Sequence, residues 1–216
     1  KWEEFIKKGN LNSANGFQLL KDYGINVADF VECQSYSQVE KYSKKLGFPI
    51  VLKTLKENLH HKTEVNGVFT DIKNLTDLRI KYKNIKKRLG RNVLISKMIS
   101  GGLEWSIGMK NDPDFGPAIM VSLGGTMIDL IDEKVVLMAP FSKEELKMKI
   151  RKLKSFKLLH GYRGSKKYSL EKLCETASKL SFLAFDFREN LKEIDLNPVI
   201  ILENDAIAVD NVFILS

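Results

Sequence analysis

Apolar positions recur with helical spacing along several stretches of the chain, and a capping residue precedes most of these stretches. In the first, Asn12 or Ser13 can cap a helix predicted over residues 12–23. Further along, Ser142 and Glu145 form a capping-box pattern that opens another helix. The same periodicity predicts helices over residues 37–46, 75–89 and 169–184.

Short apolar runs bounded by turn residues predict the strands. The last two runs, Lys192–Leu202 and Ala206–Ile214, are separated by the turn-like Glu203–Asp205 and can pair as a hairpin. Between residue 100 and the capping box, strands and turns alternate around glycines. Other strands are predicted at Ile25–Val31, Ile50–Leu52 and Asn92–Ile99. This order of helices and strands predicts a mixed α/β (α+β) fold.

A change in the character of the chain near residues 92–100 predicts a boundary between two subdomains. Local α/β units precede it, and glycine-punctuated strands follow it. We therefore expect one subdomain over residues 1–95 and a second over residues 96–216. A chain of 216 residues with 44% hydrophobic residues is long enough to bury a substantial core.

Composition excludes several classes of protein. No run of 18 or more apolar residues occurs, and the charged start Lys1–Glu4 lacks the apolar stretch of a secretory signal, so a cytoplasmic protein with no membrane partner is expected. The cysteines, Cys33 and Cys174, lie far apart without zinc-like spacing, and we expect both to be packed in the interior.

The chain is basic, with a formal net charge of +8. Its cations are spread through helical stretches such as Arg79–Lys87 and Lys147–Lys154, without the alternation of arginine and aromatic residues typical of an RNA-binding platform. This distribution favours solvated helix faces, or small anionic ligands, over a nucleic-acid partner.

Two neighbouring segments carry side chains suited to phosphate. Lys53 directly follows the apolar run Ile50–Leu52, so the strand could deliver its ammonium to a site at the strand end, although a lysine pointing at water would give the same pattern. The segment His60–Val68 combines histidines with a lysine, a hydroxyl and Gly67, which indicates a phosphate-handling loop or a polar surface turn.

A second group of candidates follows the predicted boundary. Glu104 comes soon after an apolar strand, where a carboxylate could accept hydrogen bonds from ribose hydroxyls or simply lie at a strand edge. Gly124 and Gly125 form a turn that could admit a phosphate or a closely approaching backbone. Neither the P-loop signature nor a GxGxxG motif opening a helix is present.

Oxygen-bearing side chains alternate with apolar ones near the C-terminus. This alternation places Glu193, Asp195 and Asn197 on one face of a strand. Asp210 can join them if the last two strands pair. Carboxylate and amide oxygens together with nucleotide phosphates are the usual ligands of Mg²⁺, whereas the competing interpretation is an exposed acidic sheet face.

Taken in order, these segments resemble the ATP-grasp domain of ADP-forming acyl-CoA synthetases, a group related to succinyl-CoA synthetase. The resemblance extends from about Leu11 onward. The matching landmarks are Tyr23–Ile25, Gly47–Lys53, His61–Val65, Gly67–Val68, Asp112, Phe115–Pro117, Leu123–Gly125, Ala139–Pro140, Gly161–Gly164 and Asp195–Pro198.

The resemblance implies an ATP-grasp fold of two subdomains that clamp a nucleotide, and it assigns roles to individual residues. Adenine would lie against the linking strand, and Lys53 would contact the phosphates. Glu104 falls at the ribose position, and Arg163 could bind a phosphate or stabilise a subunit contact. The implied linking-strand residues are Ser96, Lys97 and Met98, and the implied Mg²⁺ positions are Asn197 and Asp210, with Asp195 beside them.

The implied function is phosphoryl transfer between ATP/ADP and histidine, coupled to acyl-CoA formation from a carboxylic acid and CoA. His61 matches a histidine that resembles a phosphoryl relay. A CoA-binding alpha subunit or domain, carrying its own phosphorylatable histidine, would complete the enzyme as a hetero-oligomer.

Two other functions are compatible with the same residues. One is an ATP-grasp ligase that activates a carboxylate directly as an acyl phosphate and needs no histidine. The other is a nonenzymatic nucleotide-sensing module, which would bind ATP with Mg²⁺ but would never become phosphorylated.

Overall fold

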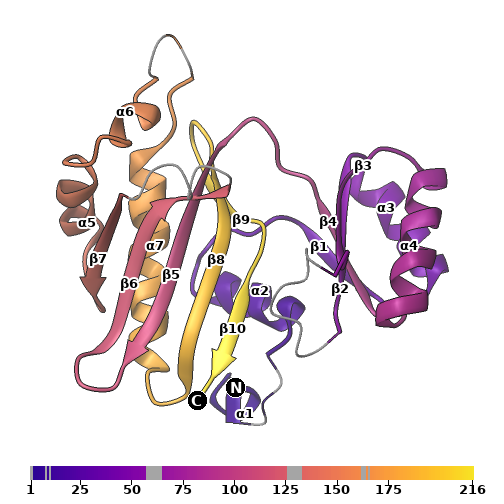
Figure 1. Ribbon diagram of the computed structural model, residues 1–216, viewed down its shortest axis with the longest axis horizontal. Coiled ribbons are helices and arrows are strands. Elements are labelled where there is room, and N and C mark those ends of the chain that lie inside the picture. The colour runs from indigo at the N-terminus through magenta and orange to yellow at the C-terminus, as the bar shows by residue number, and fades with distance from the viewer. Residues whose placement is uncertain are drawn as a thin grey trace. The chain divides into compact units, whose positions relative to one another are not determined.

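The computed structural model describes residues 2–7, 9, 11–56, 65–125, 133–161, 164 and 166–216 (Figure 1). The chain forms two compact units, Ala28–Met98 and a second made of Lys1–Val27 with Ile99–Ser216. None of the helices in the described part is long and apolar enough to cross a membrane.

The unit Ala28–Met98 is built on an antiparallel sheet of four strands in the order β1-β4-β2-β3. Helices α3 and α4 lie side by side against it (Figure 1). Its core includes the fully buried Leu52, Ile72 and Ile95. The elements are β1 (Phe30–Cys33), α3 (Tyr36–Leu46), β2 (Ile50–Thr54), β3 (Val68–Ile72), α4 (Leu75–Leu89) and β4 (Val93–Lys97).

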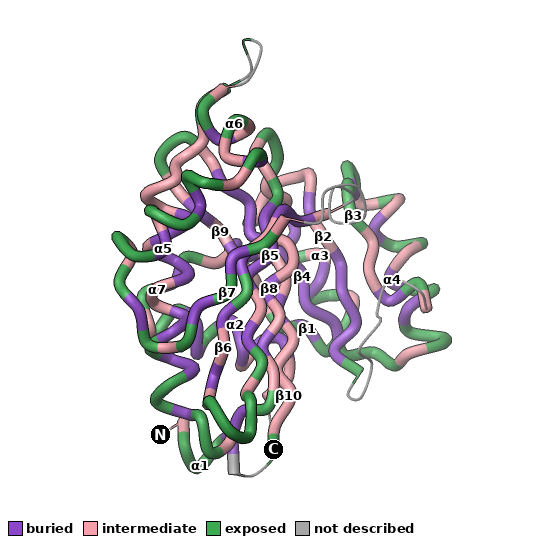
Figure 2. Tube along the Cα trace, turned by 60° about the vertical axis from the view of Figure 1, so that its left-hand side comes forward, coloured by how far each residue is buried: buried purple, intermediate pink, exposed green. Residues whose placement is uncertain are grey.

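The larger unit contains a sheet in the order β10-β8-β5-β6-β7, with β9 also paired to β8. Helix α7 packs on β5, β6, β8 and β9, and α2 packs against β10. Figure 2 marks the buried residues of these elements in purple. The elements are α1 (Trp2–Lys7), α2 (Ser13–Asp22), β5 (Leu103–Asp112), β6 (Gly116–Leu123), β7 (Lys134–Met138), α5 (Lys143–Ile150), α6 (Phe156–Leu159), α7 (Leu170–Asp186), β8 (Leu191–Ile201), β9 (Ala206–Ala208) and β10 (Val212–Leu215).

The first 27 residues pack with the C-terminal part of the chain, which differs from the expected subdomains over residues 1–95 and 96–216. Ala208 donates its backbone N–H to Asn26 O at 2.9 Å, and Val27 makes a parallel bridge with Ala208. Residues near Val27 are therefore held by β9, and the strand predicted at 25–31 begins only at Phe30.

Several helix boundaries follow from the capping residues named by the sequence. Asn12 caps α2 by accepting from Asn15 N, and Ser142 caps α5 by accepting from Glu145 N. The cap predicted for the next helix, Ser37, is wrong, because Ser35 caps α3, which begins at Tyr36. Both cysteines are fully buried, as expected.

Ion pairs join the helices of the larger unit. Glu171 on α7 accepts from Lys143 and Lys147 on α5, and these lysines hold the pKa of Glu171 at about 2. Glu175 accepts from Lys172 and Lys179, which lower its pKa to about 2 as well. Lys179 also donates to Gly24 O at 2.8 Å and so ties α7 to the end of α2.

These pairs predict an acid-dependent contribution to stability. The folded pKa of each glutamate lies below its ordinary value of 4.5, so the stabilisation is complete above pH 4.5 and is lost as the pH falls towards 2. The Glu171→Gln/Glu175→Gln variant should melt a few degrees lower at pH 7, because exposed pairs contribute roughly 0–1 kcal/mol each. The difference in melting temperature should narrow below pH 4.5 and in 1 M salt. A difference that is independent of pH would contradict this account.

Candidate functional site

One face of β8 carries the side chains predicted to bind a metal. Glu193, Asp195 and Asn197 are partly exposed, while Ile194 and Leu196 between them are buried. The predicted alternation is therefore present, and it places the oxygen-bearing side chains away from the core.

Asp210 lies opposite Asn197 because the last two strands share one register on β8. β9 pairs Ala208 with Val199, and β10 pairs Val212 with Asp195. Continuing this register places position 210 across from 197, and Val209 N donates to Pro198 O at 3.2 Å in the same stretch. Directly opposed residues of an antiparallel pair have Cβ atoms about 4.5–5.5 Å apart.

The predicted strand over residues 206–214 is interrupted where Asp210 lies. Residues 209–211 belong to neither β9 nor β10. The carboxylate therefore projects from an irregular segment held by strands on both sides, which suits a ligand more than a ladder position does.

The pKa of Asp195 reflects the burial and the negative charge of this face. Burial raises the pKa of its carboxyl, and the nearby charges of Glu193 and Asp210 raise it further. A bound cation would offset both effects, because it neutralises carboxylates that otherwise repel one another.

The donor set fits Mg²⁺ held jointly with phosphates. The described residues include no cluster of three or more His, Cys, Asp or Glu side chains arranged to hold a metal alone. Magnesium commonly takes one or two carboxylates from the protein and further oxygens from substrate phosphates and water. Asp210 and the amide oxygen of Asn197, with Asp195 nearby, match that pattern.

A bulge in β8 falls at this site. Trp105 pairs with Val199 while Ile107 pairs with Leu196, so one intervening residue of β5 faces Asn197 and Pro198 together. Bulges re-aim side chains and are frequent beside functional sites. The bulge thus separates the oxygen-bearing face of β8 from the buried run Val199–Ile201.

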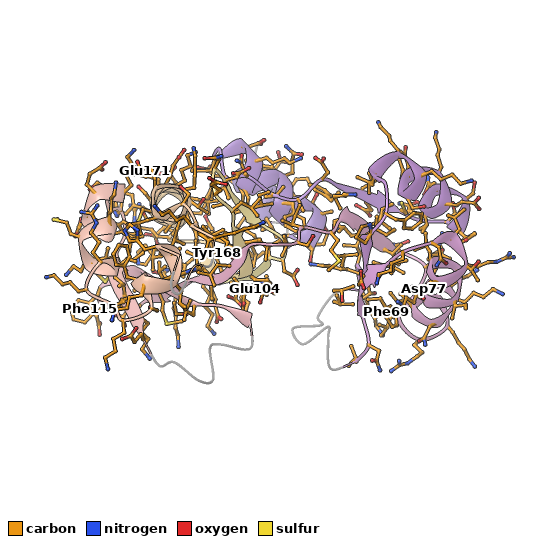
Figure 3. All side chains as sticks on the ribbon, turned by 90° about the horizontal axis from the view of Figure 1, so that it is seen from above. Phe69, Asp77, Glu104, Phe115, Tyr168 and Glu171 are labelled. Carbon is orange, nitrogen blue, oxygen red and sulfur yellow. The ribbon has the colours of Figure 1, made fainter. Side chains whose placement is uncertain are left out.

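Glu104, labelled in Figure 3, lies at the start of β5, and the two glycines that follow β6 approach it closely. Gly124 N donates to Glu104 O at 2.9 Å, and a Cβ on Gly124 would come within 2.7 Å of the Trp105 carbonyl carbon. Gly125 has φ +60°, and a Cβ there would collide with the Glu104 carboxylate. Gly124 thus allows close approach to the Trp105 backbone, and Gly125 allows close approach to the exposed Glu104 carboxylate.

Lys53 lies in β2 of the smaller unit, paired with Val68 and Leu94, and is only 4% exposed. The interpretation of a strand-end lysine pointing at water is therefore wrong. A lysine is rarely this buried unless its ammonium faces groups that compensate its charge.

The linking-strand residues Ser96, Lys97 and Met98 also lie in the smaller unit. Ser96 is buried between Phe30 and Val51. The N–H groups of Lys97 and Met98 donate to Asp29 O and Pro49 O, and Lys97 Nζ donates to Gly47 O at 2.9 Å. Both N–H groups are already bonded to backbone carbonyls. A base recognised here would therefore use other groups, or it would have to displace those carbonyls.

Two predicted site residues, His61 and Arg163, lie outside the described residues.

Two features of the site carried only a weak signal in the sequence. The bulge is signalled by Pro198 within a strand pattern, since proline in a sheet is confined to edges, strand starts and bulges. Asn211, which is buried and donates its backbone N–H to Asp210 Oδ1, is signalled only as a polar residue inside the apolar run Ala206–Ile214.

Comparison with known proteins places these features in a family. A family model described as an ATP-grasp domain matches residues 6–215. The beta subunit of acetate–CoA ligase [ADP-forming] I from Pyrococcus furiosus is 35% identical over 207 residues, covering 92% of this chain and 88% of that protein.

A longer relative contains the same module. The 4-hydroxybutyrate–CoA ligase [ADP-forming] of Nitrosopumilus maritimus is 34% identical over 91% of this chain, and the chain spans 29% of that protein's length.

Solved structures of a dinucleotide forming acetyl-coenzyme A synthetase 1 from Ca. Korarchaeum cryptofilum share the fold. One, in complex with coenzyme A and Ca-AMPCP, has a TM-score of 0.90 and 28% identity, covering 100% of this chain and 98% of that chain. Another, with a TM-score of 0.85 and 28% identity, holds Mg-AMPPCP with a phosphohistidine segment pointing towards the nucleotide binding site, and covers 100% of this chain and 98% of that chain. The chain therefore belongs to the ATP-grasp family, in the group formed by the beta subunits of ADP-forming acetate–CoA ligases and the matching domains of longer ADP-forming ligases.

Proposed function

We propose that the chain is the nucleotide-binding subunit or domain of an ADP-forming acyl-CoA ligase, and that it transfers a phosphoryl group between ATP/ADP and histidine. The observation that carries this proposal is the juxtaposition of Asn197 and Asp210 across β8, beside the carboxyl of Asp195, whose pKa is raised. This donor set needs a cation and phosphates to complete it.

The candidate site residues that the structure describes each have a proposed task in nucleotide binding. Asp210 and Asn197 hold Mg²⁺, which neutralises charge on the phosphates when it is bound. Lys53 places its ammonium on the phosphates, and Glu104 accepts from ribose hydroxyls. Catalysis by these groups consists of positioning and charge neutralisation, with no covalent step on any of them.

His61 is proposed as the phosphoryl acceptor. An imidazole nitrogen attacks the terminal phosphorus of ATP, the bond to the bridging oxygen breaks, and ADP leaves with that oxygen. In the reverse direction the phosphohistidine returns the group to ADP. Arg163 is proposed to contact a phosphate or the partner.

A CoA-binding partner is proposed to complete turnover. The chain spans most of the P. furiosus beta subunit but less than a third of the N. maritimus ligase, so the partner can be a separate chain or another part of a longer polypeptide. The phosphohistidine segment of the Korarchaeum relative supports a partner histidine that exchanges phosphoryl groups with the nucleotide site. We propose a hetero-oligomer in which the partner binds the carboxylic acid and CoA.

Phosphorylation of the chain tests the histidine relay. Incubating the protein with γ-labelled ATP and Mg²⁺, with and without the CoA-binding partner, should give acid-labile, base-stable label that His61→Ala abolishes. His60→Ala is the matched control and should retain the label. Nucleotide binding without label on either protein would favour the nonenzymatic sensor, whereas acyl-CoA formation that survives His61→Ala would favour a ligase acting through direct acyl phosphate.

Substitution of the proposed metal ligands tests the Mg²⁺ site. Asp210→Asn and Asn197→Ala should each weaken Mg²⁺-dependent ADP binding by at least roughly 10-fold, since loss of even a supporting partner costs 10–100-fold in metal affinity. Calorimetric titration with ADP at several Mg²⁺ concentrations measures this. Asp112→Asn is the control. Asp112 is the last residue of β5, and this variant should bind ADP with the same Mg²⁺ dependence as the unmodified chain. Equal ADP affinity in all variants would exclude this face of β8 as the Mg²⁺ site.

The Asp195 carboxylate should lower the stability of the nucleotide-free protein while it supports the binding of Mg²⁺ and ADP. Its raised pKa means that the charged form is penalised in the folded chain at neutral pH, so Asp195→Asn should raise the melting temperature of the nucleotide-free protein by a few degrees, with about 1 kcal/mol corresponding to roughly 2–4 °C. The gain should shrink as the pH falls through the raised folded pKa and vanish below the ordinary value of 3.8. The stabilisation of the variant by Mg²⁺ and ADP should be smaller than that of the unmodified chain. The exposed Glu203→Gln is the control, and a lower melting temperature for Asp195→Asn would contradict the assignment.

A further inference from the structure

Asn211 follows the proposed metal ligand Asp210 and is almost completely buried, with 1% of its surface exposed. Its Nδ2 donates to Ser13 O at 3.0 Å, a contact between residues 198 positions apart in the chain. Its backbone N donates to Asp210 Oδ1, also at 3.0 Å. One residue therefore joins the start of α2 to the carboxylate proposed to bind the metal.

Helix α2 makes room for this side chain. A Cβ on Gly16 would collide with Asn211 Oδ1 and would lie 2.9 Å from the ring of Phe213. Glycine is unfavourable inside a helix, so its presence in the second turn of α2 has a specific cause. That cause is the close packing of α2 on β10 around the Asn211 carboxamide (Figure 1).

The carboxamide is an unusual choice for a purely structural core position. Its Oδ1 is buried and has no hydrogen-bond partner among the described residues. Leaving a buried acceptor without a partner is costly, and an apolar residue would avoid that cost. The contact made by Nδ2 therefore serves a purpose that hydrophobic packing would not.

The segment that carries Asp210 needs such a tether. Residues 209–211 lie between β9 and β10 and outside both strands. On one side Val209 N is fixed to Pro198 O. On the other side the Asn211 side chain is anchored to Ser13 O.

Building on the proposed Mg²⁺ role of Asp210, we propose that Asn211 is a positioning residue that sets the orientation of the Asp210 carboxylate through its anchor on Ser13 O. The side chain touches neither metal nor nucleotide. Its effect is confined to the Mg²⁺ dependence of nucleotide binding, because the carboxylate that it orients contacts the metal.

Mg²⁺ titrations at fixed ADP concentration test this role in the full chain. Asn211→Ala should raise the Mg²⁺ concentration for half-maximal ADP binding roughly 10-fold, while ADP binding without Mg²⁺ stays within twofold of the unmodified chain. Gly16→Ala should act in the same direction by displacing the carboxamide. The double variant should be no worse than the more affected single variant, because both substitutions break one contact.

Ser181→Ala is the matched control for lost stability. Ser181 is a fully buried hydroxyl of the same unit that accepts from Phe141 N and donates to Ser178 O. It should lower the melting temperature without moving the Mg²⁺ midpoint. If Asn211→Ala does not fold, Asn211→Ser, with a shorter buried polar side chain, takes its place.

The outcomes separate this inference from the proposed function. A shifted midpoint in Asp210→Asn and in Asn211→Ala supports both. A shift in Asp210→Asn alone, with Asn211→Ala within twofold of the unmodified chain, overturns the positioning role and leaves the metal site standing. No shift in Asp210→Asn overturns the metal site itself, and the positioning role with it.

Discussion

The single register that β9 and β10 share on β8 is the constraint on which the candidate site depends. Because both strands keep the same pairing, the interruption between them places Asp210 opposite Asn197. A slip of one residue would turn the alternate side chains of the hairpin to the opposite face and separate the two oxygen donors. The buried residues Ala206 and Ala208 of β9 oppose such a slip, since it would turn them to the other face.

The first 27 residues reinforce this constraint. They pack with the C-terminal strands, and contacts near both ends of α2 reach the hairpin or its neighbours: Ser13 O accepts from Asn211, and Asn26 Nδ2 donates to Asp205 Oδ1 at 2.7 Å. Segments from the two ends of the chain therefore stabilise one local structure. Substitutions in α2 that disturb these contacts should therefore alter the position of the proposed metal ligands, although α2 supplies none of them.

Local signals in the sequence were sufficient for much of the fold. Capping residues such as Asn12 and Ser142 were placed correctly, and the strand alternation around Asp195 is present as predicted. Long-range packing accounts for the differences. Val27 joins Ala208 instead of extending a strand to β1, and this pairing between distant segments has no local signature.

The site was predictable in its residue types and less so in its geometry. The alternation of oxygen donors with apolar residues predicted the face of Glu193, Asp195 and Asn197, and the family resemblance singled out Asn197 and Asp210, which the strand register places opposite each other. The burial of Lys53 and the tether through Asn211 could not be predicted, since each depends on what neighbouring elements leave exposed. The role of His61 remains a prediction, because this residue lies outside the described part of the chain.

Paramagnetic broadening by Mn²⁺ in place of Mg²⁺ tests most directly whether the hairpin holds the nucleotide's metal. With ADP present, substoichiometric Mn²⁺ should broaden the backbone amide resonances of residues 194–197 and 208–211 before those of α4, and ADP should be required for the effect. Broadening centred on another part of the chain, or equal broadening without ADP, would contradict the account.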